Sequence, residues 1–199
     1  MKRTGSAAIL ASVVLSFAAP PLESATLPRK VPEFAIQMPD GTELLLSSFR
    51  EKQKSVVLVF ILTTCPHCQA FTRLLNRAQT DFGPRGLQVI ESAIEQNAKA
   101  AVPDFIRAFQ PPFPVGYNPE MAAVDLLQHP RTQIMHMPVV AFINRAGDMI
   151  AQYEANDAFM QDDVAEKNLR AKIEELLSSG GAVPARKTAT KKAPATKKK

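Results

Sequence analysis

Several features that would assign the chain to a special class are missing from its 199 residues. We find no internal repeat of solenoid length, so a repeat architecture is excluded. No cysteine lies near residue 20, which excludes a lipid-anchored lipoprotein. Tryptophan is absent, and there are only two cysteines. The remaining composition is ordinary for a globular protein, with 46% hydrophobic and 22% charged residues, and it allows one sizeable core.

Acidic residues are absent from the C-terminal segment 181–199, which carries seven Lys and Arg residues. The whole chain carries +5, of which this tail contributes +7 and residues 1–25 contribute +1, leaving −3 for residues 26–180. Because the body is mildly acidic, we expect no nucleic-acid partner. The tail is predicted to be disordered, with weak contact to an anionic surface as the functional alternative.

The first 25 residues have the pattern of an export signal. Lys2 and Arg3 precede an apolar run at 7–19 that ends at two prolines. This run is shorter than the about 20 residues that span a bilayer, although an uncleaved anchor stays an alternative. We therefore expect a periplasmic or otherwise extracytoplasmic protein, in a compartment where a disulfide can persist.

Residues 26–180 are predicted to form one α/β domain. Short apolar segments predict strands at 55–62, 86–94, 112–117, 138–144 and 149–155, after a hairpin at 33–49 that turns at Asp40-Gly41. Periodic segments predict helices that begin at Pro66 and span 98–109, 120–128 and 159–178. Because strands and helices alternate, we expect a mixed central sheet covered by helices on both faces.

The two cysteines form a C-x-x-C motif, Cys65-Pro66-His67-Cys68, between a buried strand and a helix. Cys65 falls at the helix N-cap and Pro66 at the first helical position, where proline is favoured. The positive end of the helix dipole stabilises a thiolate at Cys65, and His67 can add to this effect. Cys68 lies one turn deeper, about 5–6 Å away, within reach of a disulfide. The pattern predicts an attacking and a resolving thiol.

This motif after a buried strand, followed by HMPVVAFIN at 136–144, resembles the thioredoxin fold. The lead-in hairpin and the extra segment 98–117 resemble its TlpA-like and redoxin branch, over residues 31–178. The resemblance implies a three-layer fold with an N-terminal β-hairpin extension and a central insertion. It also implies a cis-proline loop at Pro138 that faces the cysteines, with Met137 presenting its backbone to a partner chain. The CPHC motif itself resembles the oxidising DsbA family.

Three positions depart from this family. Thr64 replaces a tryptophan, Val59 replaces a buried acid, and Phe71 replaces the glutamate of some TlpA-like reductants. The usual proton acceptors for the second cysteine are therefore missing. Glu91 or Glu95, near the end of the predicted strand 86–94, could substitute, but we expect both to be ordinary surface acids.

The sequence thus predicts an exported thiol–disulfide oxidoreductase that exchanges a Cys65–Cys68 disulfide with protein thiols. We expect a membrane or thioredoxin-type redox partner, no cofactor and no resident metal, and the direction of exchange stays open. One alternative is a Cu(I)-handling protein that uses the same cysteines, with His136 and Met137 nearby. Another is a thiol peroxidase, although Leu62 stands where peroxiredoxins place threonine.

Overall fold

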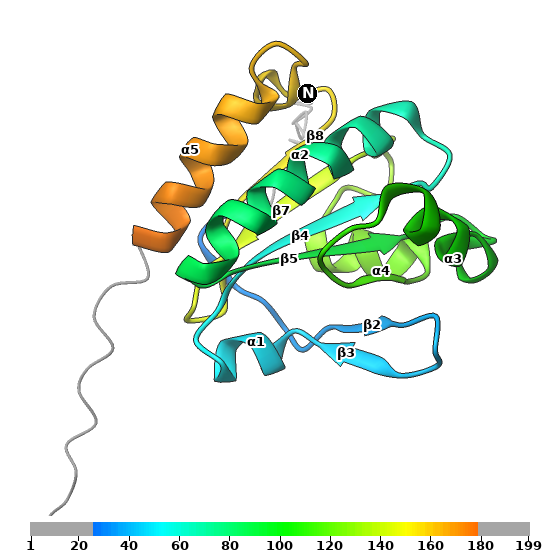
Figure 1. Ribbon diagram of the computed structural model, residues 1–199, viewed down its shortest axis with the longest axis horizontal. Helices are drawn as coiled ribbons and strands as arrows, with labels where there is room; N and C mark the ends of the chain where they lie inside the picture. The colour runs from blue at the N-terminus through cyan, green and yellow to red at the C-terminus, as the bar shows by residue number, and fades with distance from the viewer. Residues whose placement is uncertain (1–25, 179–199) are drawn as a thin grey trace, which may run out of the picture.

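One mixed eight-stranded sheet organises residues 26–178, the part of the chain that the computed structural model describes (Figure 1). The strand order is β1-β8-β7-β4-β5-β6-β2-β3. The strands are β1 (Arg29–Lys30), β2 (Ala35–Gln37), β3 (Glu43–Leu45), β4 (Ser55–Ile61), β5 (Leu87–Ala93), β6 (Val115–Tyr117), β7 (Val139–Ile143) and β8 (Asp148–Glu154). The predicted signal segment 1–25 and the lysine-rich tail 181–199 lie outside the described residues.

In the part of the chain that the structure describes, five α-helices connect or cover these strands. They are α1 (Ser47–Glu51), α2 (Pro66–Phe82), α3 (Ala98–Phe109), α4 (Glu120–Leu127) and α5 (Ala165–Ser178). Two short 3-10 turns, η1 (Gly83–Arg85) and η2 (Ala158–Met160), follow α2 and precede α5. Within residues 26–178, no helix is long and apolar enough to cross a membrane.

The centre of the sheet is the strand pair β4–β5. Every residue of β4 is buried, as expected for an apolar strand that is covered on both faces. It pairs in parallel with β5 and antiparallel with β7, and β8 continues the antiparallel edge. The predicted hairpin at the N-terminus forms β2 and β3, which extend the sheet beyond β6.

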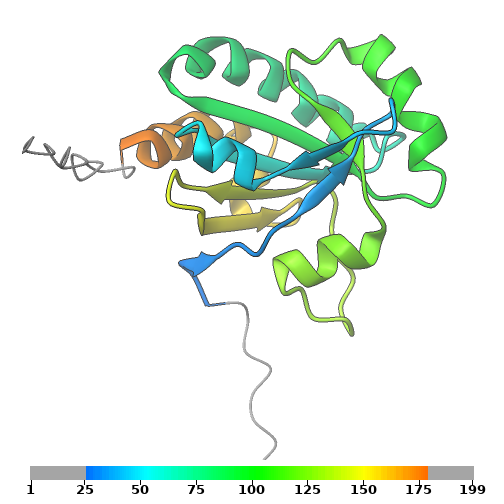
Figure 2. The same cartoon turned by 90° about the horizontal axis from the view of Figure 1, so that it is seen from below.

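Helices cover both faces of the sheet, which confirms the predicted α/β thioredoxin-like class (Figure 2). Side chains of α2, α3 and α5 form one apolar cluster with alternate residues of β4 and β5. Side chains of α1 and α4 form a second cluster with Val56, Leu58 and Phe60 of β4 and Ile90 of β5. Each apolar strand therefore contributes to two separate cores.

The C-terminal helix begins later than the sequence pattern indicates. We expected it from residue 159, whereas α5 begins at Ala165. Phe159 instead stacks on Tyr153 of β8, with ring centroids 3.9 Å apart, and meets Phe142 of β7 edge-on. These ring contacts hold the segment as a 3-10 turn against the sheet. The helix α1, at the end of the predicted hairpin, was also not expected.

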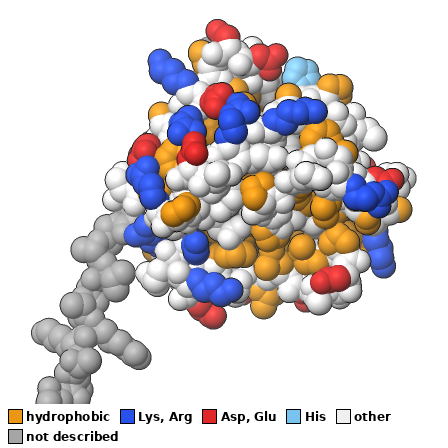
Figure 3. Space-filling view, in the orientation of Figure 1, with side chains coloured by type: hydrophobic (Ala, Val, Ile, Leu, Met, Phe, Trp, Pro, Cys, Tyr) orange, Lys and Arg blue, Asp and Glu red, His pale blue; other side chains and the backbone are white. Residues whose placement is uncertain are grey.

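On the face seen in Figure 3, basic and acidic side chains gather over α2 and α5. Three exposed ion pairs join α5 to α2 or to η1 at its end. They are Arg77–Glu166, Arg85–Glu174 and Arg170–Asp81. Exposed pairs of this kind contribute little to stability, so apolar packing must hold α5 in place.

Candidate active site

The C-x-x-C motif lies where β4 ends and α2 begins, as predicted. Cys65 is the N-cap of α2, with extended backbone angles (φ −75°, ψ 121°), and Pro66 occupies the first helical position. The backbone N–H of Cys65 donates to the carbonyl of Leu62, which closes a tight turn between strand and helix. The local sequence alone therefore positions both sulfur atoms at the carboxyl end of the central strand.

Cys65 is the accessible member of the pair. Its side chain is half-buried, and both cysteines are free thiols in this structure. Its Sγ accepts a hydrogen bond from the backbone N–H of Cys68 at 3.4 Å. A donor at a helix N-terminus stabilises negative charge on this sulfur. The geometry is thus the one expected for an attacking thiol.

Cys68 is fully buried, in the cluster beneath α2. The Leu62 N–H donates to its Sγ at 3.5 Å. Burial strongly raises the pKa of this thiol, and the nearby Cys65 and Glu91 raise it further. A thiol in this position does not ionise readily without a proton acceptor.

The Met137–Pro138 loop faces the motif, and its peptide bond is cis, which confirms that expectation. The Met137 carbonyl oxygen is 3.9 Å from the Cys65 Sγ. Glu154 of β8 anchors this loop, because its carboxylate accepts the backbone N–H of His136 at 2.8 Å and contacts Nε2 of His129 at 3.0 Å. The protein therefore fixes a backbone acceptor beside the accessible sulfur.

Two hollows flank the motif. One, of about 380 Å³, lies between the start of α2 and the start of α5. His67 is exposed and lines it, together with Pro66, Phe71 and Pro138. The other, of about 680 Å³, lies across the Met137 loop and is lined by Leu62, Glu95, Lys99, Tyr117, Met135 and Met137. An extended chain that approaches Cys65 has apolar surface on both sides.

Neither Glu91 nor Glu95 is the ordinary surface acid that we expected, so that prediction is wrong. Glu91 is fully buried on β5, and burial raises its pKa to about 8. Glu95 is partly buried, and its Oε1 accepts hydrogen bonds from the backbone N–H and the hydroxyl of Thr63. Both acids thus lie close to the motif in space.

Sequence reasoning missed Thr72 as a residue of interest. Its hydroxyl lies 2.8 Å from Oε1 of Glu91 and 2.9 Å from the Cys68 carbonyl. The available signal was its spacing, since residues i and i+4 share a helix face and Thr72 follows Cys68 by one turn. A threonine on an otherwise apolar helix face is a polar group that needs a buried partner.

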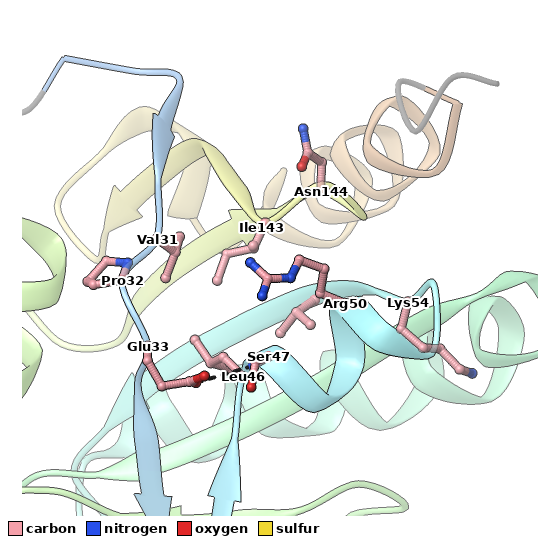
Figure 4. A pocket seen from close by; sticks show the side chains of 11 residues that line it. Val31, Pro32, Glu33, Leu46, Ser47, Arg50, Lys54, Ile143 and Asn144 are labelled. Carbon is pink, nitrogen blue, oxygen red and sulfur yellow. Dashed lines mark hydrogen bonds between the residues drawn. The ribbon is translucent and has the colours of Figure 1, made fainter. Parts of the chain in front are cut away.

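A third hollow lies at the opposite end of β4, and it is smaller, about 120 Å³ (Figure 4). Glu33 accepts the backbone N–H of Ser47 there, and Arg50 lies across from it. Neither cysteine lines this hollow. Among residues 26–178, no cluster of three or more His, Cys, Asp or Glu side chains could hold a metal ion.

A central sheet with helices on both faces, a C-x-x-C motif at the start of a helix and a cis-proline loop facing it define a thioredoxin-like protein. Comparison with protein families agrees, because residues 27–152 match the model of the AhpC/TSA family. The chain therefore belongs to the AhpC/TSA family. This confirms the predicted thioredoxin-like fold and redoxin branch.

Solved structures with the same fold include several redox proteins. A thiol:disulfide interchange protein of the thioredoxin family from Chlorobium tepidum TLS aligns with a TM-score of 0.62 and 17% identity, covering 77% of this chain and 99% of that one. A thiol:disulfide interchange protein from Bacteroides sp. aligns with a TM-score of 0.61 and 15% identity, covering 83% and 97%. The thioredoxin domain of a thiol-disulfide oxidoreductase from Bacteroides vulgatus gives 0.60 and 15%, covering 77% and 99%. No curated protein matches the chain.

Proposed function

We propose that the protein is an exported thiol–disulfide oxidoreductase that exchanges a Cys65–Cys68 disulfide or dithiol with protein thiols. The observation that carries this proposal is the asymmetry of the pair. Cys65 is accessible and accepts a helix N-terminal N–H, whereas Cys68 is fully buried one turn away. Family membership and the activities named for the structural neighbours support the same chemistry.

The exchange proceeds in two steps. The Cys65 thiolate attacks one sulfur of a substrate disulfide, forms a mixed disulfide, and releases the other substrate sulfur as a thiolate. The Cys68 thiolate then attacks Sγ of Cys65, which forms the Cys65–Cys68 disulfide and releases the second substrate sulfur. The same steps in reverse oxidise a substrate dithiol. We expect the backbone of an extended substrate to pair with the Met137 segment, and the contact between the Met137 carbonyl and Cys65 supports this.

Trapping and equilibration together test this proposal. Reduced Cys68→Ser should accumulate mixed disulfides through Cys65 with unfolded proteins that carry disulfides, releasing one substrate thiolate for each, and Cys65→Ser should not. The equilibrium of wild-type protein in glutathione buffers gives the reduction potential, and with it the preferred direction. A Cys68→Ser variant that traps no protein, together with a pair that does not oxidise in these buffers, would contradict the proposal.

The alternative activities use the same preparations. Thiol peroxidase chemistry also occurs in this family. However, Leu62 stands three residues before Cys65, where peroxiredoxins place threonine, and the hydroxyl of the neighbouring Thr63 is bound to Glu95. We therefore expect hydrogen peroxide consumption to be slow compared with disulfide exchange. Anaerobic titration of the reduced protein with Cu(I) should show no binding tighter than that of a weak chelator. Fast peroxide turnover or tight Cu(I) binding would favour those functions instead.

Export rests on the pattern of residues 1–25, a charged start followed by an apolar run. We expect the mature protein outside the cytoplasm, where it would meet a membrane or thioredoxin-type redox partner. Fractionation of cells that produce the full chain, with the mass of the recovered protein, measures both compartment and cleavage. Recovery of the uncleaved chain from the cytoplasm would contradict the proposal.

A further inference from the structure

Glu91 lies next to Val59, the position where the family pattern puts a buried acid. In the parallel pairing of β4 and β5, Val59 lies directly opposite Glu91. Val59 packs in the cluster beneath α2, and so do Val89 and Ala93, the residues two before and two after Glu91 on β5. Because alternate residues of a strand share a face, Glu91 faces α2 together with Val59. The carboxyl group therefore lies one strand away from the family's position, on the same side of the same sheet.

Burying this carboxyl group costs free energy, and this cost points to a role in function. Glu91 is fully buried, and its Oε2 has no hydrogen-bond partner among the described residues. Its Oε1 meets only the Thr72 hydroxyl. Buried polar atoms without partners are uncommon in native proteins, and a redox or catalytic role is one explanation for them. A structural role alone would be better served by an apolar side chain, such as those that surround it.

Cys68 is the titratable group that faces Glu91. It lies on α2 one turn before Thr72, and the charge of Glu91 acts directly on its thiol. The strands on either side present Val59 of β4 and Val115 of β6 next to Glu91, and neither side chain titrates. Among these neighbours, the Cys68 thiol is therefore the proton donor that faces Glu91, and the exchange reaction must ionise this thiol.

We propose that Glu91 is the proton acceptor for the Cys68 thiol and that the Thr72 hydroxyl positions its carboxyl group. The proposal rests on the proposed function, because it assigns a residue to the second step of disulfide exchange. In that step the proton of the Cys68 thiol passes to the Glu91 carboxylate, directly or through one water. The resulting Cys68 thiolate attacks Cys65 Sγ, and the Cys65–substrate bond breaks to release the substrate thiolate. Glu91 is left as a neutral acid and returns its proton to solvent or to Cys68 in the reverse reaction.

Thr72 can serve both protonation states of the acid. Its hydroxyl has one proton and lies within hydrogen-bond distance of both Glu91 and the Cys68 carbonyl. When Glu91 is ionised, this proton goes to the carboxylate. When Glu91 is protonated, the hydroxyl can accept from the acid and donate to the Cys68 carbonyl instead. The positioning contact is therefore kept throughout the cycle.

A chromogenic disulfide isolates the step in question. Excess 5,5′-dithiobis(2-nitrobenzoate) reacts with reduced protein first at Cys65, in a phase that depends on reagent concentration. A second phase, independent of reagent concentration, reports attack of Cys68 on the mixed disulfide. In the wild-type protein we expect this second rate to rise with pH and level off above a midpoint near 8, as Glu91 ionises. In Glu91→Gln it should fall by roughly 10- to 100-fold at pH 8 and lose the midpoint.

Matched variants separate a proton acceptor from a packing residue. Glu91→Asp should restore part of the rate and keep a midpoint, and Glu174→Gln, which removes an exposed carboxylate on α5, should keep the wild-type profile. Thr72→Val should move the midpoint to higher pH, because the hydroxyl bond lowers the pKa of Glu91, whereas Thr72→Ser should leave it in place. The first phase should change little in all four.

The outcomes distinguish the two proposals. If the wild-type protein shows no second phase, the Cys65–Cys68 pair does not close and the oxidoreductase function fails. If the second phase is present but Glu91→Gln keeps both its rate and its midpoint, only the role of Glu91 is wrong. A slower second phase with an unchanged midpoint in Glu91→Gln would indicate a packing effect and would also overturn the proposal.

Discussion

The two faces of the central sheet are built from the same strands but differ in chemistry. On the face covered by α1 and α4, the neighbours Leu58 and Ile90 are opposite each other and fully buried among apolar side chains. One residue further along, Val59 and Glu91 are opposite each other on the face covered by α2. There the cluster also contains the thiol of Cys68. A shift of one residue along two strands thus separates a core without buried titratable side chains from one that holds a thiol and a carboxyl group.

The difference shows that the buried groups able to change their charge are confined to one half of the core. The face beneath α4 can be optimised for packing alone, because no group there has to change its charge. The face beneath α2 must hold a thiol and a carboxyl group that exchange a proton, and burial opposes the charged state of each. Substitutions on the two faces should therefore fail in different ways.

The largest effect on activity is expected at Cys68, on the face beneath α2. Cys68→Ser removes the resolving thiol, so turnover with a disulfide substrate should fall by roughly 10³-fold, the scale on which loss of a covalent residue acts. The fold should persist, because serine is smaller and the site already holds polar groups. Steady-state reduction of a small disulfide measures this, with the unfolding midpoint as control. If Cys68→Ser kept more than a tenth of the wild-type activity, the face beneath α2 would not be the reactive one.

The largest effect on stability is expected at Ile90, on the opposite face. Ile90→Ala leaves a cavity among apolar neighbours and should cost about 2–5 kcal/mol of unfolding free energy. The rate of disulfide exchange per folded molecule should stay close to that of the wild type. Denaturant unfolding and the two-phase reaction at low temperature measure the two quantities on one sample. A change in the pH profile of Ile90→Ala would show that the faces are not independent.

Glu91 predicts a pH dependence of stability that only the α2 face can supply. Its pKa in the fold, about 8, lies above the ordinary value of 4.5. Because the folded state holds the proton more tightly than the unfolded state, protonated Glu91 contributes its full share of the unfolding free energy below pH 4.5. This contribution falls as the pH rises towards 8 and levels off above it. The loss should be on the order of a few kcal/mol.

Urea unfolding of reduced protein at pH 5, 7 and 9 measures this slope. In Glu91→Gln the slope over this window should be reduced, because the amide does not titrate. Ile90→Ala serves as the matched control, since it is destabilised at every pH but keeps the wild-type slope. Equal slopes in wild type and Glu91→Gln would contradict the assignment of the buried acid.

The smallest effect is expected on the outer surface of the α2 face. Glu174→Gln removes the acid partner of Arg85, but both side chains are about half exposed. Solvent and salt screen such a pair, so neither the unfolding midpoint nor the exchange rate should change measurably. Calorimetry at low and high salt tests this. A clear loss at low salt would show that surface charge, and not the apolar cluster, holds α5 in place.

Local signals predicted much of this molecule. The apolar β4 run, Pro66 after Cys65 and the Asp40-Gly41 turn each act through neighbouring residues, and each element formed where expected. The start of α5 was misplaced because Phe159 follows the periodic pattern of the helix but is held by ring contacts from two strands. Contacts between distant segments leave no mark on the spacing of residues.

The role proposed for Glu91 shows the same limit at the site. A strand that is buried on both faces has no alternation of polar and apolar residues, so its single acid carries no sign of which face it takes. Only the register of β5 against β4 places Glu91 beside Val59. Thr72 becomes meaningful only after that placement. The role of the cysteines could be predicted from the sequence, whereas the position of Glu91 near Cys68 follows only from the pairing of the strands.

Both edges of the sheet are short, since β1 has two residues and β3 has three. An edge strand offers free N–H and C=O groups to any extended chain, and short edges offer few of them. The Met137 carbonyl beside Cys65 lies away from both edges, on the loop that precedes β7. We expect a foreign strand to find a backbone partner there, at a place where it also meets a reactive sulfur. Clients that dock by their main chain would then be recognised by being unfolded and by carrying a cysteine, with little regard for the rest of their sequence.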